Sequence, residues 1–115
     1  MPHIDSYSFG RITIDGQSYT SDVLITRSGV NPSWWRIEGH RLQPEDLETV
    51  VAARPAILVI GTGNAGLMKV PPATRDWLVA QGIQVFVETT SPACKRYNEL
   101  AKSGADVAAA LHLTC

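Results

Sequence analysis

A glycine-rich segment, Gly61-Thr62-Gly63-Asn64-Ala65-Gly66, has the spacing most suggestive of a ligand site. Its glycines fit the G-x-G-x-x-G pattern, and Glu88 stands 22 residues after the last of them. In dinucleotide-binding domains such a loop follows a strand and opens directly into a helix. The N-terminal amides of that helix bind the pyrophosphate, while the later acidic residue binds the ribose. Taken as a string of residues, the segment therefore indicates a dinucleotide site.

Two prolines argue against that interpretation. Pro71 and Pro72 stand five and six residues after Gly66, and a proline inside a helix removes a backbone donor and clashes with the preceding turn. The next helix must therefore begin near the prolines, too late for the loop to open into it. Two alternatives stay open: the glycines permit a tight, positive-φ exit from a buried strand, or Thr62 and the loop amides line a small anion or polar-ligand pocket.

Two histidines and two cysteines raise the question of a metal site. His40 follows Gly39, His112 lies three residues before Cys115, and Cys94 is remote from both in sequence. Because no paired C-x-x-C motif is present, we expect no metal, no cofactor and structural roles for the histidines. Two cysteines are too few for a disulfide framework, so we expect free thiols, as in a reducing compartment.

Cys94 is a candidate nucleophile, because it lies in the first turn of a predicted helix, where the helix dipole lowers a thiol pKa. The alternative is a buried small hydrophobe. The sequence identifies no matching base, and no Ser/His/Asp arrangement or carboxylate pair can be singled out. It therefore leaves open whether the protein is an enzyme.

Trp34 and Trp35 are candidates for a protein interface. We expect Trp34–Glu38 to be extended, and adjacent residues of a strand point to opposite faces, so one ring is exposed unless both faces are covered. Exposed aromatic rings commonly anchor interfaces. The alternative is that a helix or the N-terminal hairpin covers that face, so that both rings are buried.

The elements that position these residues follow from the apolar pattern. Ser6–Ile14 and Gln17–Tyr19 flank the turn dipeptide Asp15-Gly16 and predict a β-hairpin, and Val23–Ile25 predicts a short strand. Beyond residue 40, helical and buried-strand patterns alternate. The helices are expected over Pro44–Ala53, from Pro71-Pro72 to Gly82 and from Thr90 to Gly104, and the strands over Ala56–Ile60, Ile83–Val87 and Val107–Leu113.

This alternation predicts the fold class. We expect an α/β fold that forms one three-layer domain over residues 1–115, with a mixed, mostly parallel central sheet flanked by helices and an N-terminal β-hairpin. The 115 residues, of which 44% are hydrophobic and 18% charged, are typical of a single globular domain.

Charge and hydropathy exclude several classes of function. The formal net charge is −1 and the ten Lys and Arg residues are scattered, so no basic stripe matches a phosphate backbone. No stretch approaches the roughly 20 apolar residues of a membrane span, and the segment that starts at Met1 lacks a targeting pattern. We expect a cytoplasmic protein that neither binds nucleic acid nor spans a membrane.

Several short motifs, in order along the chain, together resemble a known family. They are Ser8-Phe9-Gly10, Trp35-Arg36 with Gly39-His40, Gly61-Thr62-Gly63 with Gly66, Thr90-x-x-Ala93, Tyr97-Asn98 with Leu100, and Ala110-Leu111-His112-x-Thr114-Cys115. The chain resembles the family of the mitochondrial NADH:ubiquinone oxidoreductase (complex I) assembly factor three and the adipogenesis-associated domain protein, which is built on an Mth-type domain.

The resemblance implies a three-layer α/β/α-type fold with a mixed central sheet. It also implies uncharacterised bacterial members and a mitochondrial member that helps to assemble complex I. By position, eight residues match the shared pattern and become candidates for a common ligand pocket. They are His40, Gly61, Thr62, Gly63, Gly66, Thr90, Asn98 and His112.

Two functions of different classes follow. The first is a non-enzymatic protein-interaction or assembly module with an unidentified protein partner, membrane-complex subunits being among the candidates; the chain itself is a monomer or weak dimer. The second is a small-molecule or nucleotide-binding protein, in one version an enzyme, that uses the Gly61–Gly66 loop with Thr90, Asn98 and His40. In the second case, replacing Gly63 with a bulkier residue should abolish binding without unfolding the chain.

Overall fold

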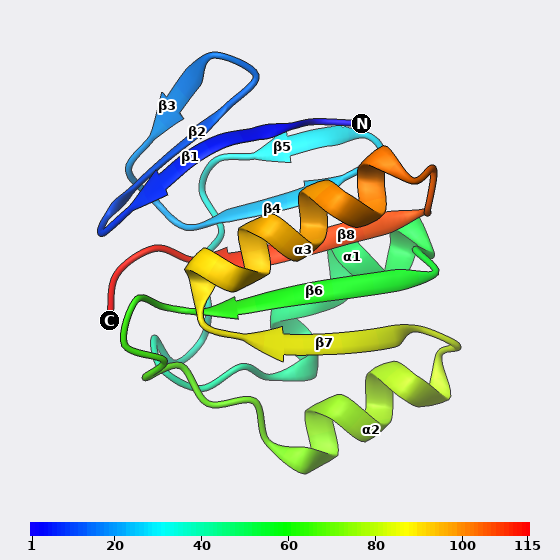
Figure 1. Cartoon of the computed structure of the whole chain (residues 1–115). Coiled ribbons are helices and arrows are strands. Elements are labelled where there is room, and N and C mark those ends of the chain that lie inside the picture. The colour runs from blue at the N-terminus through cyan, green and yellow to red at the C-terminus, as the bar shows by residue number, and fades with distance from the viewer.

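A computed structural model describes residues 1–115 as two sheets and four helical segments (Figure 1). The strands are β1 (Ile4–Ser8), β2 (Arg11–Ile14), β3 (Gln17–Tyr19), β4 (Val23–Thr26), β5 (Gly29–Asn31), β6 (Ile57–Thr62), β7 (Gln84–Glu88) and β8 (Val107–His112). The helices are the 3₁₀ helix η1 (Pro44–Leu47), α1 (Glu48–Ala53), α2 (Pro72–Ala80) and α3 (Thr90–Lys102).

The central sheet has five strands in the order β5-β4-β8-β6-β7. β6 pairs in parallel with β7 and with β8, whereas β4 pairs antiparallel with β5 and with β8. The α/β class and the mixed sheet are thus as expected, but the mostly parallel arrangement is not confirmed. The N-terminal strands β4 and β5 form a hairpin on the free side of β8, and a hairpin is antiparallel by construction.

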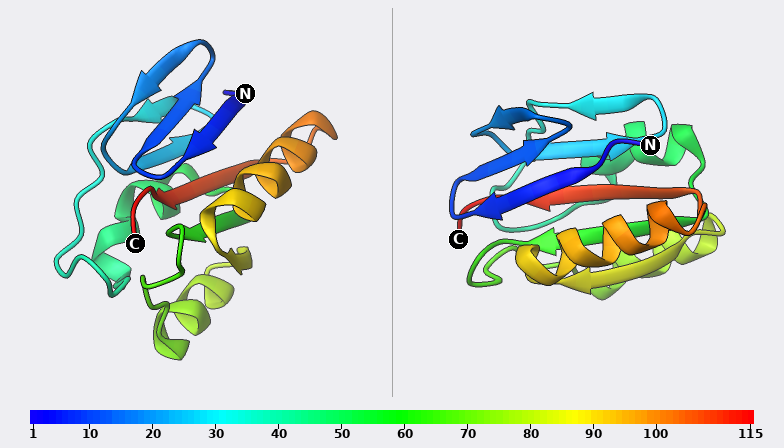
Figure 2. Two further views of the ribbon diagram at one scale, coloured as in Figure 1. Left: turned by 60° about the vertical axis from the view of Figure 1, so that its left-hand side comes forward. Right: turned by 45° about the horizontal axis from the view of Figure 1, so that its top comes forward.

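Both faces of this sheet are covered, which makes three layers. On one face lie α3 and the small antiparallel sheet β1-β2-β3; on the other lie η1, α1 and α2 (Figures 1 and 2). Along β6, Val59 belongs to the first core and Leu58 and Ile60 to the second, as the two-residue period of a strand requires.

The N-terminal hairpin is confirmed at β2 and β3, where Asp15 (φ 48°) and Gly16 (φ 80°) form the turn. Positive φ at both central residues is typical of a type I′ turn. The segment expected as one strand, Ser6–Ile14, is divided by a second turn at Phe9-Gly10, with a φ of 74° at Gly10. The small sheet consequently has three strands.

The later elements follow the apolar pattern closely. α2 begins at Pro72 and Gly82 follows it with a φ of 82°; β8 is a strand, not an alanine-rich helix. Pro44–Ala53 is not one continuous helix, because the backbone leaves the helical region at Leu47 (φ −117°) between η1 and α1. No helix is long and apolar enough to cross a lipid bilayer.

The expectation of an extended strand over Trp34–Glu38 is wrong. These residues form a loop, in which the Trp34 amide donates to the Asp22 carbonyl at 3.0 Å and the Ile37 amide donates to Asp46 Oδ1 at 3.0 Å. A carboxylate and a distant carbonyl thus satisfy backbone groups that a strand would have paired in a ladder.

Candidate functional site

The carboxyl ends of the parallel strands meet at one edge of the sheet, here called the carboxyl edge. The Gly61–Gly66 loop follows β6, Thr89-Thr90 follow β7 and Leu113–Cys115 follow β8. In open α/β sheets ligands bind beyond such ends. Figure 2 shows residues 113–115 between the turn of β1 and β2 and the loop that leaves β6.

The glycine loop is filled by the chain itself. The amide of Asn64 donates to the carbonyl of Thr114 at 2.6 Å, and the amide of Leu67 donates to the carbonyl of Cys115 at 2.8 Å. The Gly63 amide donates to Thr90 Oγ1 at 2.9 Å. Amides that would face a phosphate in a dinucleotide site are therefore occupied by the protein's own oxygens.

The glycines are required by close approach of the backbone. A Cβ at Gly63, where φ is +105°, would lie 2.4 Å from the carbonyl carbon of Cys115. A Cβ at Gly61 would lie 2.9 Å from Thr90 Oγ1. Gly66 has a φ of +76°. The geometry thus supports the alternative in which the glycines permit a tight, positive-φ exit from a buried strand. It contradicts the expectation that a bulky residue at Gly63 leaves the fold intact.

Two threonines join this loop to the neighbouring strands. Thr90 Oγ1 accepts the Gly63 amide and donates to the carbonyl of His112 at 2.6 Å. Thr62 Oγ1 donates to the carbonyl of Glu88 at 3.1 Å. The Glu88 carboxylate is bonded to Arg96 at 2.7 and 3.1 Å, so the structure uses it in an ion pair.

Asn98 lies apart from the other candidates. Its side chain donates to the carbonyl of Ile4 at 2.7 Å and accepts the amide of Ile4 at 3.0 Å. It therefore fastens the start of β1 to α3. Of the eight candidate pocket residues, Asn98 is the one that the structure does not bring to the carboxyl edge.

A buried cluster of Asp22, Arg36 and His112 lies at this edge. The antiparallel register of β4 and β8 brings Asp22 beside His112, with Asp22 Oδ2 2.8 Å from His112 Nδ1. Arg36 Nη1 is also 2.8 Å from Asp22 Oδ2 but is not aligned for a hydrogen bond. Asp22 Oδ1 accepts the amide of Leu113 at 2.8 Å. One carboxylate thus holds a loop, a strand end and residue 113 together.

The contacts of His112 determine which of its two ring nitrogens carries the hydrogen. A neutral imidazole nitrogen beside a carboxylate oxygen at 2.8 Å must carry the hydrogen, because two lone pairs would repel, so Nδ1 donates to Asp22. Arg36 Nη2, at 3.1 Å from the same nitrogen, is then a close neighbour and not a second donor to it. His112 Nε2 is buried without a hydrogen-bond partner.

Burial alone would raise the pKa of Asp22, but hydrogen bonds outweigh it. His112 Nδ1 and the Leu113 amide donate to the carboxylate and the Arg36 guanidinium lies beside it, and together they hold the pKa of the carboxyl below its usual range. Asp22 is therefore ionised at neutral pH and neutralises Arg36.

The cluster positions the tryptophan pair. Arg36 lies over the ring of Trp34, 4.7 Å from its centre, and Trp34 Nε1 donates to the carbonyl of Asp46 at 3.0 Å. Trp34 is buried at 5% exposure, whereas Trp35 is 83% exposed. Both line a surface hollow of about 420 Å³. Its other lining residues are Thr20, Ser21, Asp22, Arg36, Gly39 and Thr114.

His40 and His112 lie close together, as expected for two residues of a common pocket. Their ring centres are 5.5 Å apart with an angle of 70° between the planes. His40 is exposed and His112 buried, and no group of three metal-ligating side chains forms anywhere in the structure.

Sequence reasoning missed Asp22 and did not single out the role of Arg36. The only local signals are an acidic residue directly before the apolar run of β4 and an arginine directly after two tryptophans. Pairing Asp22 with His112 requires the β4–β8 register, which joins positions 90 residues apart.

Cys94 is not activated. The expected first-turn position is wrong, because α3 starts at Thr90 and Cys94 is in its second turn. Burial raises the pKa of its thiol to about 12. The thiol packs in the core with Ala93 and Tyr97. The alternative of a buried small hydrophobe is the one that the structure supports.

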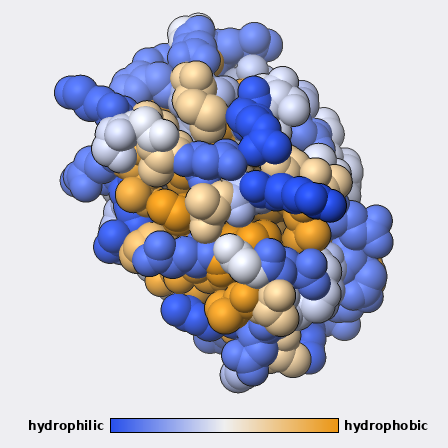
Figure 3. Space-filling model, turned by 90° about the vertical axis from the view of Figure 1, so that its right-hand side faces the viewer, coloured by the Kyte–Doolittle hydropathy of each residue, from blue (hydrophilic) through white to orange (hydrophobic).

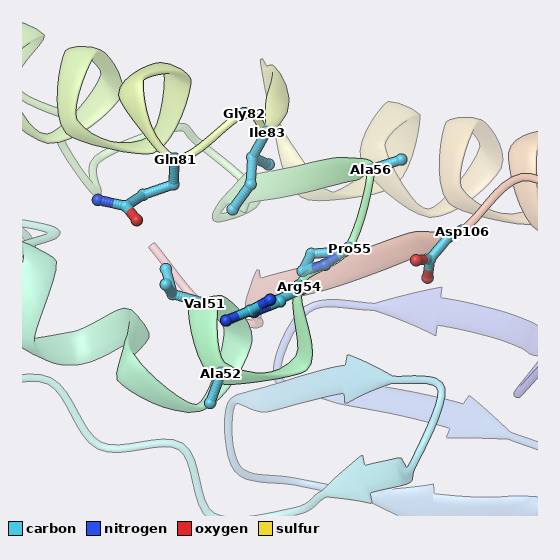
Figure 4. Close-up of a pocket in the computed structure, with 9 residues that line it drawn as sticks. All are labelled: Val51, Ala52, Arg54, Pro55, Ala56, Gln81, Gly82, Ile83 and Asp106. Carbon is cyan, nitrogen blue, oxygen red and sulfur yellow. The ribbon is translucent and has the colours of Figure 1, made fainter.

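A larger hollow, of about 660 Å³, lies at the opposite edge of the sheet, where α1 and α2 end. In Figure 4, Val51 and Ile83 point into the space between these helix ends, and Figure 3 shows apolar side chains in the middle of this face. Asp106, which also lines it, is paired with Arg27 at 2.9 Å. None of the candidate residues lies there.

A family model described as a protein of unknown function (DUF498/DUF598) matches residues 4–112. The chain belongs to the DUF498/DUF598 family. The match covers all the strands and helices, including the carboxyl edge up to His112.

Solved structures of the same fold include members from several organisms. PH1505 of Pyrococcus horikoshii OT3, a conserved hypothetical protein, is 27% identical with a TM-score of 0.81, over 97% of this chain and 98% of that one. A protein of Bartonella henselae described as an outer membrane protein is 25% identical with a TM-score of 0.85, over 99% and 96%. A Bordetella pertussis protein described as a Mth938-like domain is 20% identical with a TM-score of 0.70, over 97% and 85%. The expected Mth-type domain is thereby confirmed for this DUF498/DUF598 chain.

Proposed function

We propose that this DUF498/DUF598 protein is a non-enzymatic interaction module that binds a partner protein through the hollow beside Trp35. The observation that carries the proposal is the contrast within the tryptophan pair: Trp34 is buried and Trp35 is 83% exposed. A large aromatic side chain at the rim of a hollow is the kind of anchor that dominates protein interfaces.

Preorganisation supports the proposal. Trp35 lies between two residues that are fixed on the protein side, because Trp34 is bonded to Asp46 and Arg36 is paired with Asp22. A loop that is already ordered loses little conformational entropy on binding. The buried cluster of Asp22, Arg36 and His112 then holds the binding loop in place.

The partner and its location are parts of the same proposal. The resemblance to a complex I assembly factor and the description of the Bartonella relative as an outer membrane protein both support a partner that belongs to a membrane complex. The two free cysteines support placing the module itself in the cytoplasm, as a monomer or weak dimer.

Site-specific photo-crosslinking in cells tests the proposal. A photoreactive residue at Ser21, which lines the hollow, should give discrete protein adducts. The second substitution Trp35→Ala should weaken them by about 30-fold, the effect of removing an anchor worth about 2 kcal/mol. Val79→Ala, which removes another exposed apolar side chain on α2, should leave them unchanged.

A second photoreactive position supplies the control. Ser103 ends α3 at the opposite edge and should give different adducts or none. Identical adducts from Ser21 and Ser103, or adducts from Ser21 that do not respond to Trp35→Ala, would contradict the proposal.

The alternative function, a small-molecule site at the glycine loop, requires movement of the chain. Residues 114 and 115 occupy the loop amides, so a ligand of Gly61–Gly66 must displace them. A thermal-denaturation screen against nucleotides and phosphorylated metabolites separates the two functions. A ligand at 100 times its dissociation constant stabilises by ~2.7 kcal/mol, which raises Tm by about 10 °C in a domain of this size.

A further inference from the structure

We propose that the carboxyl edge also docks on an anionic lipid bilayer, with three loop tips inserting apolar side chains between the headgroups. The tips are Phe9 in the turn of β1 and β2, Ile37 in the loop between β5 and η1, and Leu67 in the loop between β6 and α2. Their exposed fractions are 61%, 65% and 47%. This contact goes beyond the proposed protein partner and uses side chains that do not line the Trp35 hollow.

Backbone hydrogen bonds join the three loops that carry these tips to the same edge. Gly10, next to Phe9, donates to the carbonyl of Leu113 at 2.8 Å, and Leu67 donates to the carbonyl of Cys115, also at 2.8 Å. The amide of Lys69 donates to the carbonyl of His40 at 2.7 Å. This bond joins the loop that carries Ile37 to the loop that carries Leu67. In Figures 1 and 2 all three loops lie at the end of the molecule that is marked C. Loop tips at one end of the molecule can meet a flat surface together.

The location of the apolar side chains distinguishes these tips from the rest of the surface. Six large hydrophobic residues are exposed, and Met1 and Val79 are the only two outside this edge and the Trp35 hollow. Aliphatic and aromatic side chains on protruding tips can enter the headgroup region of a bilayer, where they bury apolar surface without a complementary groove.

Charge favours an anionic surface. Each tip is followed within four residues by an exposed basic residue, namely Arg11, Arg41 and Lys69, and none of the three is in an ion pair within the protein. Glu38 is the one acidic residue among these tips, whereas the whole chain carries a net charge of −1. The three tips thus carry more basic than acidic side chains, although the chain as a whole is slightly acidic. Basic residues near an anionic leaflet each add about 1 kcal/mol of attraction.

Vesicle co-sedimentation of the full chain tests this inference. Vesicles of phosphatidylcholine and phosphatidylglycerol in equal amounts should sediment the protein, and vesicles of phosphatidylcholine alone should not. Lys69→Gln should weaken binding by about fivefold, and the double variant Phe9→Ala, Leu67→Ala should abolish it. Raising the salt concentration should also release the protein, because exposed charges are screened.

Matched variants away from the edge supply the controls. Lys95→Gln removes an exposed charge on α3 and Val79→Ala an exposed apolar side chain on α2; both should bind as the original chain does. Failure to bind the anionic vesicles, or equal loss with Lys95→Gln and Lys69→Gln, would overturn the lipid contact. If the Ser21 adducts persist in that case, the edge binds protein only and the proposed function stands.

Discussion

Replacing Gly63 with alanine should destabilise the protein far more than the same change at Gly82. Both glycines have positive φ, +105° and +82°, so both variants carry backbone strain of about 1–2 kcal/mol. At Gly82 nothing lies within 4 Å of the added Cβ, whereas at Gly63 the Cβ would meet the Cys115 carbonyl carbon at 2.4 Å and the Thr114 oxygen at 2.8 Å. Only the Gly63 variant must therefore displace residues 114 and 115.

The size of the difference follows from the hydrogen bonds that would be lost. Displacement breaks the bonds from Asn64 to Thr114 and from Leu67 to Cys115, each worth about 1 kcal/mol. The free energy of unfolding should thus fall by about 2 kcal/mol more for Gly63→Ala than for Gly82→Ala, which corresponds to about 8 °C in Tm for a domain of this size.

Urea denaturation measures this difference directly, provided that the slope m is unchanged between variants. The rate of alkylation of Cys115 gives a local readout, since displacement should raise it in Gly63→Ala and not in Gly82→Ala. Equal unfolding free energies for the two variants, with equal alkylation of Cys115, would refute the view that residues 114 and 115 close the glycine loop.

Three further predictions concern side chains of the core and the carboxyl edge. Asp22→Asn should lower the free energy of unfolding by about 3 kcal/mol at neutral pH, because Arg36 is left buried without its partner. Since the folded-state pKa of Asp22 is lowered, this difference should persist above the unfolded pKa of about 4 and vanish as pH falls through the folded value, which denaturation at several pH values will show. Thr90→Val should cost about 1–3 kcal/mol in a thermal melt, because the buried Gly63 amide loses its acceptor; exposed Ser91→Ala is the control. Iodoacetamide at mildly alkaline pH should label Cys115 in the native protein and leave Cys94 unmodified until urea is added, because burial raises the pKa of Cys94 to about 12; rapid native labelling of Cys94 would contradict its placement in the core.

Local patterns predicted the regular elements well. The apolar runs Ala56–Ile60 and Ile83–Val87 correspond to β6, which is buried on both faces, and to β7, the half-buried edge strand, and Gly82 and Gly104 follow their helices with positive φ. β5 was missed, since three residues carry too little periodicity to separate a strand from the turn that precedes it.

Long-range contacts explain what local patterns could not predict. Trp34–Glu38 has strand-like composition, yet Asp22 and Asp46 hold it as a loop. The glycine string fits a dinucleotide fingerprint, but residues 114 and 115 occupy its amides. In both cases the deciding partner is remote in sequence, and a single sequence does not reveal which distant oxygen will satisfy a given amide.

The position of β8 at the centre of the sheet has a consequence for how the chain folds. The C-terminal strand separates β4 from β6, and β4 pairs with it across most of the length of the chain. Contacts of such high sequence separation slow folding, because a long loop must close before they form. During synthesis the N-terminal strands cannot take their final places until β8 has left the ribosome. The strands of the central sheet should therefore fold together as one cooperative unit once β8 is available.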